Sequence, residues 1–432
     1  MKRNNSFSRR KFLEYGSLGL AGVLSSPGSL SGKNRQDAFL FPDHNLHTMA
    51  LQEDINLIGS YGRWAAQLMG DQPGRSSFRN SRFKDPGNWK RQALSRVREL
   101  LAPPAVTKVP EVNVLAEYSF DGLSIKKLRW QLPYGPATEA YYLRPLNVRG
   151  KLPGVLALHD HGGNKYFGKQ KIVNISENKH PMLVDHQKEY YSGRAWANEL
   201  AKKGYAVLVN DTFTFESRKV LLKDVPPVIR MGVSDVSEKE ESKDIEAYNR
   251  WAANHEHILA KSLFSAGTTW PGVFLTDDQV ALSVLSAQEE VDVGRLGCCG
   301  LSGGGLRTVV LGGMDQRIKA AVCVGMMSTW RDLILYHSFT HTWMMFMPLM
   351  PEEMDYSELF ALQLPAPRMV LNNIEDGLFN INEMRRADGF LKEVYQKAGV
   401  PQNYTAEFYP GIHKFDLKMQ QSAFAWMDKW LK

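Results

Sequence analysis

The chain has 432 residues, of which 43% are hydrophobic and 23% charged, with 35 Gly and 21 Pro. This composition is typical of a folded protein and excludes a disordered or fibrous chain. The formal net charge is +7, but five basic residues and one acidic residue give the first 31 residues +4 of that excess. No other basic stripe is present, so we expect no nucleic-acid partner.

The chain contains three cysteines, Cys298, Cys299 and Cys323, and all three lie in apolar runs. They form no CxxC pair and are too few for a disulfide framework. We therefore predict that they are buried and act as small hydrophobic side chains.

The first 31 residues look like a twin-arginine signal peptide. Residues 8–13 read Ser-Arg-Arg-Lys-Phe-Leu, and a weakly apolar run over residues 16–24 follows. The pattern predicts the twin-arginine export machinery as a partner and a periplasmic or secreted location. No later stretch reaches the 18 or more apolar residues of a membrane span, so we expect no stable membrane anchor.

Apolar spacing predicts helices over 46–70 and 87–102, the second ended by Pro103-Pro104, and we expect residues 32–108 to form an N-terminal helical segment. Strands and helices then alternate through 109–432. This alternation predicts an α/β fold with a mostly parallel central sheet and helices on both faces. Strands are predicted at 112–118, 125–132, 137–144, 154–159, 204–209, 295–300, 319–324, 368–371 and 404–409, and helices at 196–203, 277–289 and 419–431.

Three segments are too long to be simple connections: 164–193, 211–272 and 325–363. Long insertions in a compact domain usually cover a functional site, so we expect lid-like insertions. The second contains a charge run at 238–244, interpreted as a solvated helix face, and then helical spacing over 248–264. The third holds seven of the 17 methionines. These could wall an acyl or sugar pocket or simply pack the core, and both readings stay open.

The sequence Gly-Leu-Ser-Gly-Gly at 300–304 follows a predicted strand and precedes a predicted helix. A serine at the apex of a strained strand-to-helix turn needs small neighbours, which glycine supplies. The context indicates a nucleophile elbow with Ser302 as the nucleophile. The same geometry would direct the Gly303 N–H at a developing oxyanion.

A serine nucleophile needs a histidine base and a carboxylate that orients it. Asp376 follows the predicted strand at 368–371, and His413 follows the last predicted strand. The chain order Ser, Asp, His is the order of α/β-hydrolase triads. Glu375 is adjacent to Asp376 and could in principle take the acid role.

His-Asp-His-Gly-Gly at 159–163 ends a strand expected near the centre of the sheet. Such a turn can supply a second oxyanion donor, for which we nominate the Gly163 N–H. His159, Asp160 and His161 also suggest metal ligands, but no further ligand pair has supporting spacing. We therefore expect no metal and no cofactor.

From about residue 155 to the C-terminus the chain resembles the α/β-hydrolase superfamily, in its dienelactone-hydrolase and acetylxylan-esterase-like branch. The resemblance rests on four motifs: 159–163, 292–304, the Asp376 turn and Pro-Gly-Ile-His at 410–413. Dienelactone hydrolases carry a cysteine at the elbow, where this chain has Ser302. The resemblance therefore implies a serine esterase or a related acyl hydrolase.

These observations predict an exported serine esterase. Its substrate would be an oligosaccharide ester or a small-molecule ester, with short acyl groups on a carbohydrate as the favoured class. Two alternatives remain. A peptidase of the prolyl-oligopeptidase type shares the elbow and the triad order, although the residues before 112 are too few and too helical for a propeller. A catalytically inactive exported binding protein on the same scaffold is the other.

Overall fold

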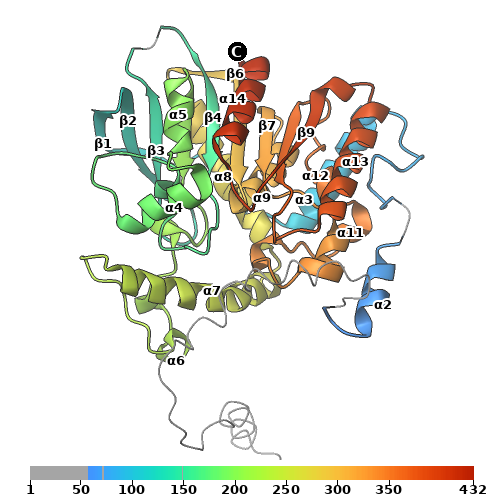
Figure 1. Cartoon of the computed structure of the whole chain (residues 1–432), viewed down its shortest axis with the longest axis horizontal. Helices are drawn as coiled ribbons and strands as arrows, with labels where there is room; N and C mark the ends of the chain where they lie inside the picture. Colours follow the sequence, from blue (N-terminus) through green and yellow to red (C-terminus); the bar gives the residue numbers. More distant parts are fainter. Residues whose placement is uncertain (1–56, 71–72, 148) are drawn as a thin grey trace, which may run out of the picture. The chain divides into compact units, whose positions relative to one another are not determined.

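The computed structural model describes residues 57–70, 73–147 and 149–432 (Figure 1). The expected signal peptide at 1–31 lies outside these residues, as does the first part of the helix expected over 46–70. Within the described ranges nine strands form one mixed sheet in the order β1-β2-β3-β5-β4-β6-β7-β8-β9. They are β1 (Asn113–Phe120), β2 (Leu123–Trp130), β3 (Thr138–Pro145), β4 (Leu152–Leu158), β5 (Ala206–Asn210), β6 (Val291–Leu301), β7 (Ile318–Val324), β8 (Arg368–Asn373) and β9 (Tyr404–Tyr409).

The sheet has an antiparallel part and a parallel part. The pairs β1–β2, β2–β3 and β3–β5 are antiparallel, and every neighbouring pair from β5 through β4, β6, β7 and β8 to β9 is parallel. The predicted α/β fold with a mostly parallel sheet is therefore confirmed. Because parallel strands all end at one edge, the loops after β4, β6, β8 and β9 meet there.

Helices cover both faces of the sheet, with the strand side chains alternating between two cores. α5 (Trp196–Lys202) and α14 (Leu417–Leu431) share one core with Val155 and Cys299, and α8 (Trp270–Ser286) and α9 (Gly303–Met314) share the other with Leu156 and Cys298. Figure 1 shows α5 and α14 in front of the sheet and α8 and α9 behind it. The prediction of buried cysteines is confirmed, because all three are at most 2% exposed.

The described part of the N-terminal segment packs on the domain that follows it. α2 (Tyr61–Leu68) is shorter than the helix expected there, whereas α3 (Pro86–Leu101) agrees with the prediction and is capped by the Asp85 carboxylate. The end of α3 contacts the start of α8: the Thr269 hydroxyl donates to the Leu101 carbonyl at 2.8 Å. A Cβ on Gly272 would lie 2.0 Å from the same oxygen.

The long insertions contain helices of their own. The first holds α4 (Pro181–Tyr191), the second α6 (Pro227–Arg230) and α7 (Ser242–Ser265), and the third α10 (Trp330–Asp332), α11 (Met350–Glu353) and α12 (Tyr356–Leu359). The charged residues at 238–244 were expected to form a solvated helix face, and this is only partly confirmed. Residues 238–241 are exposed but precede α7, which begins at Ser242. α13 (Ile381–Lys397), between β8 and β9, was not predicted.

The seven methionines of the third insertion are core residues. Each is at most 5% exposed and belongs to the larger hydrophobic cluster of the sheet: Met326, Met327, Met344, Met345, Met347, Met350 and Met354. This favours the packing interpretation. The exposed aromatic side chains of the segment are Phe339 and Trp343.

Candidate active site

Ser302 lies at the apex of the turn between β6 and α9. Its φ of 56° and ψ of −118° fall in a region that side-chain-bearing residues rarely adopt. The neighbouring strand holds this conformation, because the Ser302 N–H donates to the carbonyl of Val324 on β7 at 2.9 Å. This strained strand-to-helix turn has the geometry of a nucleophile elbow.

Two glycines allow the elbow to pack against the end of β4. A Cβ on Gly304 would lie 2.0 Å from the carbonyl oxygen of Leu158, and a Cβ on Gly300 would lie 2.5 Å from the same atom. Neither position can hold a larger residue without moving backbone. The glycines therefore fix how closely α9 approaches the loop at 159–163.

His413 and Asp376 form a hydrogen-bonded pair at this edge of the sheet. The Nδ1 of His413 lies 2.6 Å from the Oδ2 of Asp376, which is 2% exposed. The imidazole lies against Gly325, where a Cβ would be 3.0 Å from both the His413 ring and the side chain of Leu301. The His413 Nε2 is buried and has no hydrogen-bond partner among the described residues. The His413 imidazole thus packs near Leu301, the residue that precedes Ser302.

Glu375 takes a different partner. Its carboxylate accepts from the Gly411 N–H, and its own N–H donates to the Gly411 carbonyl at 3.2 Å. The residue is exposed, whereas the second oxygen of Asp376 accepts from the Leu378 N–H at 3.0 Å. The arrangement favours Asp376 over Glu375 as the partner of His413.

The surroundings of His413 raise its pKa. Burial alone lowers the pKa of an imidazole, but the charge of Asp376 and the hydrogen bond that the ring donates to it outweigh burial, with smaller contributions from Asp160 and Glu189. Because the carboxylate holds Nδ1, the free Nε2 is the atom that can accept a proton.

The loop at 159–163 lies against the start of α9. A Cβ on Gly303 would be 3.0 Å from the backbone nitrogen of His161, so these two backbone units face each other. The Gly163 N–H donates to the Nδ1 of His161 at 3.1 Å. The donor nominated from the sequence therefore already has an acceptor, and the His161 N–H is the loop donor that lies nearest Gly303.

A buried ion-pair cluster holds the His161 ring. Glu256, on α7, is 4% exposed, and its Oε1 lies 3.1 Å from the His161 Nε2 and 2.5 Å from the Lys165 Nζ. Its Oε2 accepts from the backbone N–H of Trp343 at 3.2 Å. Burial raises the pKa of a carboxyl group, but Lys165 and His161 lower that of Glu256 to about 2. The second and third insertions are thus joined to the loop beside Ser302.

The sequence did not single out Glu256, nor the residues that hold Asp160. The Oδ1 of Asp160 accepts from the Tyr191 hydroxyl and lies 3.1 Å from the His186 Nε2, both from the first insertion. Burial raises the pKa of Asp160, but His186 and Lys171 lower it well below its usual range. The insertion's length predicted a cover, but nothing in its pattern distinguished these side chains.

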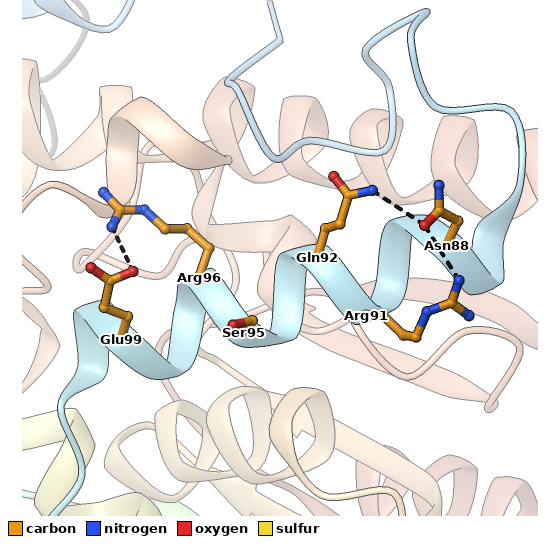
Figure 2. Close-up of a pocket in the computed structure, with 6 residues that line it drawn as sticks. All are labelled: Asn88, Arg91, Gln92, Ser95, Arg96 and Glu99. Carbon is orange, nitrogen blue, oxygen red and sulfur yellow. Dashed lines mark hydrogen bonds and ion pairs between the residues drawn. The ribbon is translucent and has the colours of Figure 1, made fainter.

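Two further observations concern other kinds of site. A shallow pocket of about 470 Å³ runs along the exposed face of α3, and its side chains pair with one another, as between Arg96 and Glu99 (Figure 2). Its lining includes none of Ser302, Asp376 and His413.

Among the described residues, no group of three His, Cys, Asp or Glu side chains is placed to hold a metal ion. In the same ranges no helix is long and apolar enough to cross a membrane.

The strained serine turn and the His–Asp pair at the ends of parallel strands define an α/β-hydrolase fold, and comparison with known proteins agrees. No family model matches the chain. It is 24% identical over 295 residues to the "Putative hydrolase YtaP" of Bacillus subtilis (strain 168), which covers 68% of this chain and 83% of that protein.

Solved structures of esterases share the fold. The structure described as "a putative acetyl xylan esterase" from Bacteroides fragilis superposes with a TM-score of 0.60 and 17% identity, over 83% of this chain and 84% of that one. A glucuronoyl esterase from Solibacter usitatus superposes with a TM-score of 0.52 and 13% identity, over 78% and 91% of the two chains. At these identities the likeness shows the fold alone.

Proposed function

We propose that the chain is a serine esterase that hydrolyses carboxylic esters, with short acyl groups on a carbohydrate as its substrate class. The observation that carries the proposal is the His413–Asp376 pair, which leaves Nε2 without a partner and packs the imidazole against Gly325, near Leu301 and the strained Ser302 turn. The names of the structurally similar acetyl xylan and glucuronoyl esterases support the carbohydrate class.

In the first half-reaction, the His413 Nε2 takes the proton of the Ser302 hydroxyl as Oγ attacks the ester carbonyl. The Gly303 and His161 N–H groups stabilise the oxyanion, with His161 replacing Gly163 for the reason given above. Asp376 fixes the tautomer of His413 and stabilises the imidazolium. The tetrahedral intermediate then collapses as the imidazolium protonates the leaving alcohol, which departs and leaves an acyl-serine.

In the second half-reaction, the oxygen of a water molecule attacks the acyl carbonyl while His413 takes a proton from that water. The Ser302 oxygen leaves and recovers the proton from the imidazolium. The products are the alcohol and the carboxylic acid, and the enzyme returns to its starting state.

The test compares wild type, Ser302→Ala and Ser286→Ala in hydrolysis of p-nitrophenyl acetate and in labelling by a fluorophosphonate. Ser286 is a matched control because its hydroxyl only bonds a carbonyl of its own helix, that of Leu282 at 2.7 Å. We expect Ser302→Ala to lose about 10⁴-fold or more in kcat and all labelling. Retention of more than about a tenth of the activity would remove the serine mechanism.

We also propose that the chain is exported by the twin-arginine route. The support is the Ser-Arg-Arg-Lys-Phe-Leu sequence at 8–13, which a receptor reads as an address and not as charge alone. Replacing Arg9 and Arg10 with Lys should retain the protein in the cytoplasm. Unchanged periplasmic yield on cell fractionation would show that another route exports it.

A further inference from the structure

Lys171 is a buried cation that the mechanism above does not use. It belongs to a short 3₁₀ turn, η2 (Lys169–Lys171), in the first insertion, and it is fully buried. Its Nζ donates to two successive carbonyls of the loop beside Ser302, that of Asp160 at 2.9 Å and that of His161 at 2.8 Å.

We propose that Lys171 is a positioning residue that holds and polarises the Asp160–His161 peptide so that its N–H serves as the second oxyanion donor. The inference rests on the proposed function and deepens it. Lys171 does not touch the ester, and it acts through the backbone of the loop.

The geometry of a peptide unit supports this assignment. In a trans peptide the carbonyl and the N–H point in opposite directions, so a group that holds the carbonyl oxygen of Asp160 also aims the N–H of His161. That N–H lies on the side of Gly303, where a Cβ would be 3.0 Å from the His161 nitrogen. The His159 Nδ1 lies 3.0 Å from the same Asp160 oxygen, so two groups fix one end of this peptide.

Because the Lys171 donor is charged, it polarises the Asp160–His161 peptide as well as holding it in place. A hydrogen bond to a carbonyl strengthens the N–H of the same peptide as a donor, and the effect is larger when the donor is ionised and water is excluded. The Lys171 ammonium meets both conditions, since it is fully buried and 5.0 Å from the centre of the Phe215 ring. The oxyanion exists only after attack, so this interaction should stabilise the transition state more than the bound ester.

Burial and the neighbouring charges together place the pKa of Lys171 within the pH range in which kinetics can be measured. Burial lowers its pKa, and Asp160, Glu216 and Asp211 raise it again, with a net value of about 8. The carboxylates of Asp211 and Glu216 are shared with Lys169, whose Nζ lies 2.8 Å from Asp211. His159 and His161 also face Lys171, and burial keeps the pKa of both below its usual value. The cation is therefore present below about pH 8 and lost above it.

The test compares Lys171→Met with Lys169→Met, a control from the same turn whose ammonium pairs with carboxylates away from the loop. Rates are normalised to sites labelled to completion by the fluorophosphonate, which also shows that Ser302 is functional. We expect Lys171→Met to lower kcat for p-nitrophenyl acetate about 10- to 100-fold with KM nearly unchanged, less than direct loss of an oxyanion donor. Lys169→Met should lower stability but leave kcat per labelled site unchanged.

A pH profile separates positioning from a structural role. Wild-type kcat should fall as pH rises through about 8, and Lys171→Met should lack this fall. If Lys171→Met does not fold, the wild-type protein still decides: its affinity for an aryl trifluoromethyl ketone, which forms an oxyanion at Ser302, should weaken over the same range. Unchanged kcat in Lys171→Met, or wild-type kcat and affinity that stay constant to pH 9.5, would overturn the inference. Labelling at Ser302 would leave the serine mechanism intact in that case.

Discussion

Glu375 and Asp376 are consecutive carboxylates that one turn after β8 directs to different partners. Asp376 is buried and lies 2.6 Å from the Nδ1 of His413, whereas Glu375 is exposed and accepts from the backbone of Gly411. The Gly411 contact holds the loop that leads to His413. The two carboxylates therefore have separable roles, one electrostatic and one in loop geometry.

Asp376→Asn should lower kcat on the order of 10⁴-fold, because an amide no longer fixes the tautomer that leaves Nε2 free to accept a proton. Glu375→Gln should cost little, since an amide oxygen can still accept from the Gly411 N–H. Steady-state kinetics on p-nitrophenyl acetate measure both. The reverse order of effects would assign the acid role to Glu375.

The acid side of the pH profile should report His413. Its pKa is raised above the ordinary value of about 6.5, and only the neutral ring can accept the serine proton. We expect kcat/KM to rise with pH through a midpoint above 6.5, and residual activity in Asp376→Asn to have a lower midpoint. A wild-type midpoint well below 6.5 would contradict a histidine base held by this carboxylate.

Glu256 should contribute strongly to stability, because it compensates the buried ammonium of Lys165. Glu256→Gln keeps the shape but leaves that cation unpaired, so we expect a loss of about 3 kcal/mol in urea unfolding at pH 7. The exposed pair of Glu352 with Arg75, at 2.7 Å, provides the control: Glu352→Gln should cost under about 1 kcal/mol.

The pH dependence of the Glu256 effect has a definite sign. Its pKa is lowered to about 2, so its stabilisation is present above the unfolded value of about 4.3 and disappears as pH falls towards 2. Wild type and Glu256→Gln should therefore converge in stability in acid. A difference that stays constant down to pH 2.5 would show that the charge of Glu256 is not the source.

The parallel strands were predictable because each is a short apolar run buried on both faces, as β4 and β8 are. The strained turn at Ser302 and the loop positions of Asp376 and His413 were predictable because glycines and strand ends mark them locally. α13 was missed: its buried residues, among them Leu391, recur at helical spacing, but polar side chains dominate its composition.

The loop at 159–163 shows why the remainder was not predictable. Gly163 was the natural choice from a His-Gly-Gly turn, but the ring of His161 accepts from its N–H. The conformation of this loop depends on side chains from distant insertions, here Glu256 and Lys171. Such contacts have no spacing that a single sequence reveals.

The final prediction concerns the acyl group. The Trp343 side chain is 39% exposed, and the backbone N–H of the same residue donates to Glu256, which also holds the His161 ring. The backbone next to this exposed indole is thus joined through Glu256 to the loop beside Ser302, and we expect the ring to limit the space for an acyl chain. Hydrolysis of p-nitrophenyl esters should therefore peak at acetyl to butyryl and fall steeply by octanoyl.

Trp343→Ala should flatten this chain-length profile, because removing the ring opens space for further methylenes, each worth about 1–3 kcal/mol in a closed apolar pocket. Tyr118→Ala, which removes an exposed ring from the edge strand β1, should leave the profile unchanged. Measuring kcat/KM for each ester of the series in wild type and both variants tests this prediction. A wild-type rate that keeps rising to long chains would indicate a lipase-like groove, and the assignment to short acyl groups on carbohydrates would then have to be abandoned.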